Sequence, residues 1–369
     1  MVWNGMLRGA PLPAPRGMPE AGTGSTPYRS RLESKTGETS TGENRIMLKG
    51  TILLTGGTGS LGTAILKRAL SEQWDCAITV YTRDEMKQQA LARELGPAPN
   101  VRYAIGDIAD YDTLERVMVG HDTVLHAAAF KHIPAGELNV GAMLQTNLVG
   151  SQNVITAALR TRVSRVLGIS TDKACAPVNA YGASKMLMER AFQEANQAGL
   201  TAFHLVRYGN VLDSTGSVLP LWKKQIARGE PITVTDPHMT RFWLGIDRAV
   251  QLVLDALRIA PGNILIPQLR GLSMARFAEF VFPDAPVKTI GLRPGEKLHE
   301  CLLTREETRR SLVAPLNHLP HFVLRAPDAE QLDETDAYTS DTAPEMTRQE
   351  LLKLLALPVD AVERVEVAA

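Results

Sequence analysis

The sequence predicts an α/β fold in which a doubly wound parallel sheet carries a smaller C-terminal substrate-binding subdomain. Two observations support this prediction. Short apolar segments alternate with helical segments of about 10–15 residues, the pattern of successive strand–helix–strand units with parallel strands. A glycine-rich loop, GGTGSLG, directly follows the first apolar segment and precedes a helical one. Strands that are apolar almost throughout indicate a sheet that helices cover on both faces.

Each strand is expected where a short run of apolar and β-branched residues ends near a turn signal. The expected strands are residues 51–55, 77–81, 101–105, 123–126 and 163–170. Helical periodicity predicts helices at residues 64–72, 84–95, 114–119 and 142–161. Beyond about Asn210 the alternation loosens, so we expect the smaller subdomain there. A last helix is expected at residues 347–355, where Thr347 and Glu350 have the spacing of a capping box.

The composition narrows the class of protein. The 369 residues include 40 Lys and Arg and 40 Asp and Glu, so the formal net charge is zero. This balance argues against a dedicated binder of nucleic acid or of an anionic membrane surface. No apolar run is long enough to span a membrane. Three cysteines far apart in the sequence indicate neither a disulfide framework nor a metal site, and they suit a reducing cytoplasm.

The glycine-rich loop has the pattern of a dinucleotide-binding turn. Gly57, Gly59 and Gly62 satisfy GxGxxG, and Gly56, Gly59 and Gly62 satisfy the wider GxxGxxG. Glycines allow the tight turn and the close approach of a pyrophosphate, which the following helix N-terminus favours. The alternative is a purely structural glycine turn. We therefore predict a Rossmann-type domain with these loop residues at the cofactor: Gly56, Thr58, Gly59, Ser60 and Leu61.

The end of the second strand should select the cofactor. An acid there favours NAD, whereas a cation favours the 2′-phosphate of NADP. Thr82 is followed by Arg83, and Lys87 lies one turn later, so we expect NADP. Asp84 leaves NAD as the less favoured cofactor. The alternative without a cofactor role is that Arg83, Asp84 and Lys87 are the solvated first residues of a helix. Two residues after the third strand are expected at the adenine, with an ordinary turn as the alternative: Asp107 and Ile108.

The catalytic residues are expected after the fifth strand. Tyr181 and Lys185 are four residues apart, so they share one face of a helix. A nearby ammonium would lower the pKa of the tyrosine and make it a usable base for an alcohol proton. An isolated YxxxK is usually structural. Here it lies about ten residues after a strand that ends in Thr171, downstream of a dinucleotide loop, and that context is more specific.

These motifs resemble the extended short-chain dehydrogenase/reductase superfamily. Within it, the chain is similar to the inverting UDP-N-acetylglucosamine 4,6-dehydratases of pseudaminic acid biosynthesis. The resemblance covers roughly residues 49–325. The membrane-anchored relatives of that group carry Met where Tyr181 stands. The motifs that carry the resemblance are STDKACAPVNAYGASK, YTRDEMKQ, HAAAFKHIP, RYGNVL, MTRFW and RPGEKLHE.

The resemblance implies a role for each catalytic residue. Tyr181 would remove the C4 hydroxyl proton while Thr171 hydrogen-bonds the C4 oxygen. Lys173 would remove the C5 proton, and Asp172 would protonate the departing C6 hydroxyl. Lys185 would hold the ribose and tune Tyr181. The cofactor, NADP, would be recycled in each turnover. A surface ion pair is the alternative for Asp172 and Lys173.

Other residues carry over more weakly. Ala127 and Ala128 are expected along the cofactor, and Asn147 is expected to fix backbone geometry. Each of the following could instead be structural, but we expect them at the substrate: Lys131, Asn210, Arg241, Arg293 and Glu296. The stretch after RYGNVL departs from the family pattern, with Asp213 in place of a glycine and Thr215 in place of a cation. The reaction type is therefore better supported than the substrate.

The expected organisation has four parts: a disordered tail at 1–46, an NADP-binding Rossmann domain at 47–210, an interleaved substrate-binding subdomain at 211–330, and a C-terminal extension at 331–369. Met47 could alternatively be the true start. The expected protein is a cytoplasmic homo-oligomer that binds a nucleotide sugar. Two other functions stay open: an epimerase, or a dehydratase of different regiochemistry, on another UDP-sugar, and a non-catalytic NADP-binding regulator.

Overall fold

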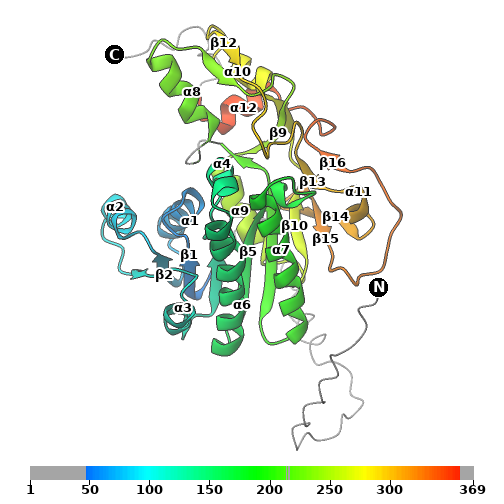
Figure 1. Cartoon of the computed structure of the whole chain (residues 1–369). Coiled ribbons are helices and arrows are strands. Elements are labelled where there is room, and N and C mark those ends of the chain that lie inside the picture. The colour runs from blue at the N-terminus through cyan, green and yellow to red at the C-terminus, as the bar shows by residue number, and fades with distance from the viewer. Residues whose placement is uncertain (1–46, 213, 215–216, 358–369) are drawn as a thin grey trace, which may run out of the picture. The chain divides into compact units, whose positions relative to one another are not determined.

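A computed structural model describes residues 47–357, except 213, 215 and 216. Its central layer is a nine-stranded sheet in the order β14-β15-β10-β6-β5-β4-β1-β2-β3 (Figure 1). Seven of these strands pair in parallel, and the last two along the chain form an antiparallel edge. The strands are β1 (Gly50–Thr55), β2 (Cys76–Thr82), β3 (Val101–Ile105), β4 (Thr123–His126), β5 (Arg165–Thr171), β6 (Ala202–Tyr208), β10 (Ile264–Pro267), β14 (Ser311–Leu316) and β15 (Leu319–Leu324). The predicted α/β fold with a doubly wound, largely parallel sheet is confirmed.

Helices cover both faces of this sheet. On one face α3, α6 and α7 pack against one another, and on the other α1 packs against α9 (Figure 1). Each presents an apolar stripe to the sheet; in α1 this stripe includes Ile65, Leu66 and Ala69. The helices are α1 (Ser60–Ser71), α2 (Glu85–Leu95), α3 (Tyr111–Met118), α6 (Gly150–Thr161), α7 (Ala180–Ala195) and α9 (Ile246–Ala256).

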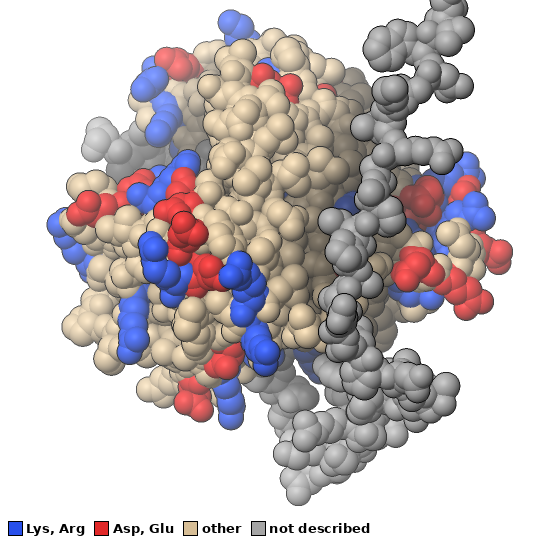
Figure 2. All heavy atoms as spheres, turned by 60° about the horizontal axis from the view of Figure 1, so that its bottom comes forward, with Lys and Arg blue, Asp and Glu red and all other residues tan. Residues whose placement is uncertain are grey.

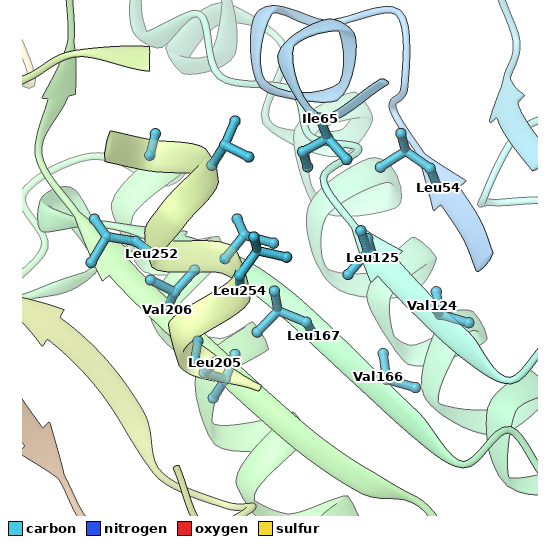
Figure 3. Close-up of a cluster of buried hydrophobic side chains, with 14 of the residues drawn as sticks. Leu54, Ile65, Val124, Leu125, Val166, Leu167, Leu205, Val206, Leu252 and Leu254 are labelled. Carbon is cyan, nitrogen blue, oxygen red and sulfur yellow. The ribbon is translucent and has the colours of Figure 1, made fainter. Parts of the chain in front are cut away.

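The main core lies where α1 and α9 meet the central strands. Figure 3 shows Leu252 and Leu254 of α9 and Ile65 of α1 gathered with side chains from β1, β4, β5 and β6. Leu54 and Leu167 from those strands are fully buried. Burying one such side chain contributes about 1.5–3 kcal/mol. This core holds the carboxyl ends of β1, β4 and β5 in fixed positions.

The helix expected at residues 142–161 is interrupted. It consists of α5 (Val140–Leu144), a π-helical turn (Gln145–Val149) and α6. The turn buries Asn147, whose side chain bonds Phe130 N at 2.7 Å, Phe130 O at 2.9 Å and Ser184 Oγ at 3.0 Å. Single π turns inside α-helices occur frequently at functional sites. Asn147 thus fixes the backbone beside the site, as expected.

The C-terminal subdomain has a second core. Trp222, Trp243 and Phe277 form its centre, and the Trp243 and Phe277 ring centroids are 4.7 Å apart. The expected capping box is present, because Thr347 accepts from Glu350 N and Glu350 accepts from Thr347 N. The elements of the C-terminal subdomain are β7 (Asn210–Val211), α8 (Val218–Ala227), β8 (Ile232–Val234), β9 (Thr240–Leu244), β11 (Gly271–Ser273), α10 (Met274–Val281), β12 (Val287–Thr289) and α12 (Arg348–Leu354).

The remaining short elements are α4 (Ile133–Leu138), β13 (Cys301–Leu303), α11 (Arg305–Thr308) and β16 (Tyr338–Thr339). On the face in Figure 2, Lys and Arg side chains mix with Asp and Glu side chains on either side of a broad uncharged band. Within the described part of the chain, no helix combines the length and the apolar character that a membrane span requires.

Candidate active site

A cavity of about 670 Å³ lies at the carboxyl ends of the parallel strands. Ligands of open α/β sheets usually bind in this position. The cavity brings together all residues that were predicted at the cofactor: Gly56, Thr58, Gly59, Ser60, Leu61, Thr82, Arg83, Lys87, Asp107, Ile108, Ala127, Ala128, Tyr181 and Lys185. Segments far apart in the sequence therefore form one continuous lining.

The glycines of the loop after β1 are required by close backbone contacts. Gly56 has a φ of +70°, and a Cβ there would lie 2.6 Å from Ala128 N. A Cβ on Gly62 would lie 2.5 Å from Gly57 Cα. No side chain could be added at either position without moving the backbone of β4's end or of the loop. The first turn of α1 lines the cavity, so its N-terminus can receive a phosphate.

The two cations that are predicted to bind the 2′-phosphate of the ribose each have an acidic partner. Arg83 Nη1 is 3.0 Å from Asp107 Oδ2, and Lys87 Nζ is 3.0 Å from Asp84 Oδ2. Asp84 caps α2, accepting from Lys87 N at 3.0 Å, and this bond lowers the pKa of Asp84. Asp84 is thus occupied at the helix start, while Arg83 and Lys87 remain exposed at the rim of the cavity.

The predicted catalytic residues meet where β5 ends against α7. Asp172, Lys173 and Ala174 form a 3₁₀ turn after Thr171. Thr171 Oγ1 donates to Asp172 Oδ1 at 2.9 Å, and Lys173 Nζ donates to the same oxygen at 3.0 Å. The turn packs so closely on α7 that a Cβ on Gly182 would collide with the Lys173 carbonyl. Only glycine fits at position 182, next to Tyr181, against the turn formed by Asp172, Lys173 and Ala174 (the catalytic turn).

Lys185, which the spacing predicts to lower the pKa of Tyr181, is not among the groups that shift this pKa in the structure. Burial raises the pKa of Tyr181 to about 12, and the cation that opposes this shift is Lys173. Burial lowers the pKa of Lys185 to about 8, with Glu189 acting in the opposite direction. Lys185 Nζ contacts Met188 Sδ at 2.9 Å. Its side chain therefore runs along α7 toward residues 188 and 189, which is the physical reason for the difference.

A second acidic group, which sequence reasoning missed, lies against the predicted catalytic cluster. Glu300 Oε1 lies 3.3 Å from Lys173 Nζ, and its side chain is 3% exposed. The two carboxylates raise the pKa of Lys173 against the effect of burial. Burial raises the pKa of Asp172, and the Glu300 charge raises it further. The motif RPGEKLHE contains Glu300, but only its first acid was selected from the sequence.

The residues expected at the substrate fall into two groups. Lys131 and Asn210 line the cavity, and burial lowers the pKa of Lys131. The other three lie outside the lining that the described residues form. Arg241 is buried and donates to Thr240 O at 2.7 Å. Arg293 and Glu296 bond each other, with Nε to Oε1 at 3.0 Å.

Two serines also line the cavity without having been predicted. Ser214 and Ser217 follow β7, and Ser217 Oγ is buried without a hydrogen-bond partner among the described residues. They belong to the stretch whose departure from the family pattern had been noted, and that departure was the signal available in the sequence. Asp213 and Thr215 lie outside the described residues.

Comparisons with known proteins agree on one family. The model of the polysaccharide biosynthesis protein family matches residues 52–318. An inverting UDP-N-acetylglucosamine 4,6-dehydratase of Campylobacter jejuni is 42% identical over 265 residues, which are 70% of this chain and 79% of that protein. A UDP-glucose 4-epimerase of Rickettsia conorii is 35% identical over 335 residues, 85% of this chain and 97% of that protein.

Solved structures lead to the same conclusion. The X-ray structure of Pen from Bacillus thuringiensis has a TM-score of 0.77 and 34% identity, and the match covers 83% of this chain and 97% of that one. The family match includes every strand of the sheet except β15 and the first two residues of β1, and it includes the whole predicted catalytic cluster. The glycine-rich loop and residues of the segment Thr171–Lys185 line one cavity. Together with the family match, this shows that the chain belongs to the polysaccharide biosynthesis protein family.

Proposed function

We propose that the protein is a C5-inverting nucleotide-sugar 4,6-dehydratase. It converts UDP-N-acetylglucosamine, or a close analogue, to a 4-keto-6-deoxy sugar. One observation carries the proposal: a buried acid–base pair, Asp172 and Lys173, directly follows Thr171 at the wall of the cavity, which Thr171, Lys173 and Tyr181 line. The similarity to the Campylobacter dehydratase supports the same reaction.

The residues present fit a dinucleotide, and two cations at the rim of the cavity support NADP in preference to NAD. The glycine loop and the first turn of α1 would hold the pyrophosphate. Arg83 and Lys87 would hold the 2′-phosphate, which is the reason to favour NADP. Asp107 and Ile108 would lie beside the adenine, and Lys185 would hold the ribose. When bound, the nicotinamide supplies a hydride acceptor for C4 and later a hydride donor for C6.

The first role belongs to Tyr181 and Thr171. Tyr181 would take the proton of the C4 hydroxyl, while Thr171 would hold the C4 oxygen. Oxidation of C4 acidifies the C5 proton, which the neutral amine of Lys173 would remove. Reprotonation of C5 on the opposite face would complete the inversion.

Water loss at C6 needs a proton donor. Burial raises the pKa of Asp172, which suits a group that must hold a proton when the C6 hydroxyl departs. Asp172 is fully buried and does not line the cavity, whereas Thr171 and Lys173 do. Its proton would therefore reach the C6 oxygen through Thr171 or Lys173, both of which contact its Oδ1.

The test is incubation with UDP-N-acetylglucosamine in heavy water. A dehydratase gives a product lighter by one water, with deuterium at C5 and a C5 configuration opposite to that of the substrate by NMR. An epimerase, the second candidate, gives a product of unchanged mass with the C4 configuration inverted. The similarity to the Rickettsia epimerase favours that candidate. A non-catalytic regulator would bind NADP and form neither product.

We also propose a cytoplasmic homo-oligomer. The three cysteines, at 76, 175 and 301, are far apart in the sequence and do not have the pattern of a disulfide framework, which suits a reducing compartment. The division into a cofactor domain at 47–210, an interleaved substrate subdomain at 211–330 and an extension from 331 remains part of this proposal. Mass measurement of the native protein would test the assembly, since a monomer would contradict it.

A further inference from the structure

Glu300 reaches the catalytic turn from a distant part of the chain. It precedes β13, and its Oε1 lies 3.3 Å from Lys173 Nζ and 3.7 Å from Arg241 Nε. Lys173 Nζ lies between this carboxylate and that of Asp172, at 3.0 Å from Asp172 Oδ1. Both acids are almost completely buried, with exposures of 3% and 0%. Lys173 thus bridges two buried carboxylates at the cavity wall.

The backbone holds Glu300 independently of its carboxylate. Its amide donates to Ser340 Oγ at 2.9 Å, and its carbonyl accepts from Ser340 N at 2.8 Å. One carboxylate oxygen, Oε2, is buried and has no hydrogen-bond partner among the described residues. A buried carboxylate with an unused oxygen costs stability, so it calls for a role besides packing.

The catalytic chemistry defines that role. As a base, Lys173 must be neutral, and as an acid, Asp172 must be protonated. The resting arrangement, an ammonium beside a carboxylate, becomes this active form when one proton moves from Lys173 Nζ to Asp172 Oδ1 along their 3.0 Å contact. The total number of protons on the pair does not change. A fixed negative charge nearby sets the pH range in which the pair holds one proton.

We propose that Glu300 is a positioning residue that anchors Lys173 against Asp172 and sets the pH range in which this pair holds a single proton. The proposal rests on the dehydratase function and deepens it. The charge of Glu300 favours the proton-bound form of both neighbours, because a negative charge stabilises an ammonium and disfavours a second carboxylate. Other titratable or charged groups around the cluster are Lys131, Tyr181, Arg241 and Lys297.

The variant Glu300→Gln keeps the shape and removes the charge. Activity should rise with pH as the pair loses the first of its two protons and fall as it loses the second. Without the Glu300 charge both pKa values fall, so both limbs of the pH profile should move to lower pH. We expect a shift of at least one pH unit. We also expect kcat to fall at least tenfold at the wild-type optimum, with KM changed less than threefold.

Two further variants separate charge from structure. Glu300→Asp keeps the charge on a shorter side chain, so its profile should stay at the wild-type pH while kcat falls. Glu345→Gln removes an exposed acid that pairs with Arg276, and it should leave the profile unchanged. NADP binding and urea unfolding of each variant verify that the fold is intact. An unshifted Glu300→Gln profile in an active, folded enzyme overturns the role of Glu300 and leaves the dehydratase function standing.

If the wild-type enzyme forms no 4-keto product, the proposed function fails, and Glu300 is tested without turnover. NMR of ¹⁵N-lysine-labelled holoenzyme follows the Lys173 ammonium, identified by its loss in Lys173→Met. Its pKa should be lower in Glu300→Gln than in the wild type. An equal or higher value contradicts the proposed effect of Glu300.

Discussion

Arg207 and Glu307 form two parallel hydrogen bonds, from Nη1 to Oε2 and from Nη2 to Oε1, each 2.9 Å long. Arg207 lies on β6 in the centre of the sheet, and Glu307 lies in α11. The same guanidinium donates to Glu189 of α7, with Nε to Oε1 at 2.9 Å. One buried cation therefore joins the sheet, the helix of Tyr181 and the segment that follows Glu300.

Replacing Arg207 should destabilise the whole protein. Arg207→Met leaves Glu189 and Glu307 buried without their cation, which costs about 3–5 kcal/mol. Urea unfolding would measure this loss. Arg276→Met is the matched control, because Arg276 is half exposed beside Glu279 and Glu345, and it should change stability by less than about 0.5 kcal/mol. Equal losses in the two variants would contradict the importance of the buried cluster.

Acid should weaken the same cluster. Burial would raise the pKa of Glu307, but the charge and hydrogen bonds of Arg207 outweigh it and lower this pKa from 4.5 to about 2. A carboxyl whose pKa is lowered by folding contributes stability above its unfolded pKa and loses that contribution as the pH falls toward its folded value. We expect up to about 3 kcal/mol of wild-type stability to be lost between pH 5 and pH 2 through this group. In Glu307→Gln, the unfolding free energy should depend less steeply on pH over that range.

A methyl group at Gly62 should disrupt the cofactor loop. Gly62→Ala forces its Cβ against Gly57, so NADP affinity should fall at least tenfold and the unfolding free energy by about 1–3 kcal/mol. Fluorescence titration and urea unfolding test both effects. In Gly141→Ala the added Cβ meets no atom within 4 Å among the described residues, and α5 should gain up to about 1 kcal/mol. Unchanged NADP binding by Gly62→Ala would contradict the assigned position of the pyrophosphate.

Arg83 and Lys87 should distinguish the two cofactors. The double variant Arg83→Ala/Lys87→Ala should bind NADP at least tenfold more weakly and NAD almost as before, because only NADP carries the 2′-phosphate. Calorimetric titration with both nucleotides measures this. Lys67→Ala, which removes an exposed cation paired with Glu94, should affect neither. Equal or tighter binding of NAD than of NADP by the wild type would remove the role of both cations.

Lys173 and Tyr181 should fail at different steps. Lys173→Ala should still bind NADP and oxidise C4 but should not lose water, whereas Tyr181→Phe should lose C4 oxidation at least a hundredfold. Absorbance of the reduced nicotinamide in a single turnover separates the steps. Tyr103→Phe, on the exposed surface of β3, should behave as wild type. Full dehydration by Lys173→Ala would refute its assignment as the C5 base.

Local sequence patterns predicted the parts of the site that are short in sequence. The loop from Gly56 to Gly62 and the pair Tyr181 and Lys185 depend on spacing within one turn or helix, and strand periodicity fixed where β5 ends. Parallel strands end at one edge of the sheet, so these residues had to meet there. The interruption at residues 145–149 was missed because Asn147 in that turn bonds Phe130 and Ser184, which lie outside the helix.

Glu300 was missed for a different reason. Its position beside Lys173 depends on how the chain returns from the subdomain to β13, which no periodicity reports. Arg293 and Glu296, chosen from the same motif, bond each other away from the described cavity lining. A motif located the segment, but only the three-dimensional path showed which acid faces the catalytic lysine.

The long sequence separation of Arg207 from Glu307 has a consequence during synthesis. Glu307 is made 100 residues after Arg207. At translation rates of roughly 5–20 residues per second, this delay is about 5–20 s. During that interval β6 carries a guanidinium without its second carboxylate, and the edge strands β14 and β15 do not yet exist. The cofactor half of the protein is therefore translated while its sheet is still incomplete.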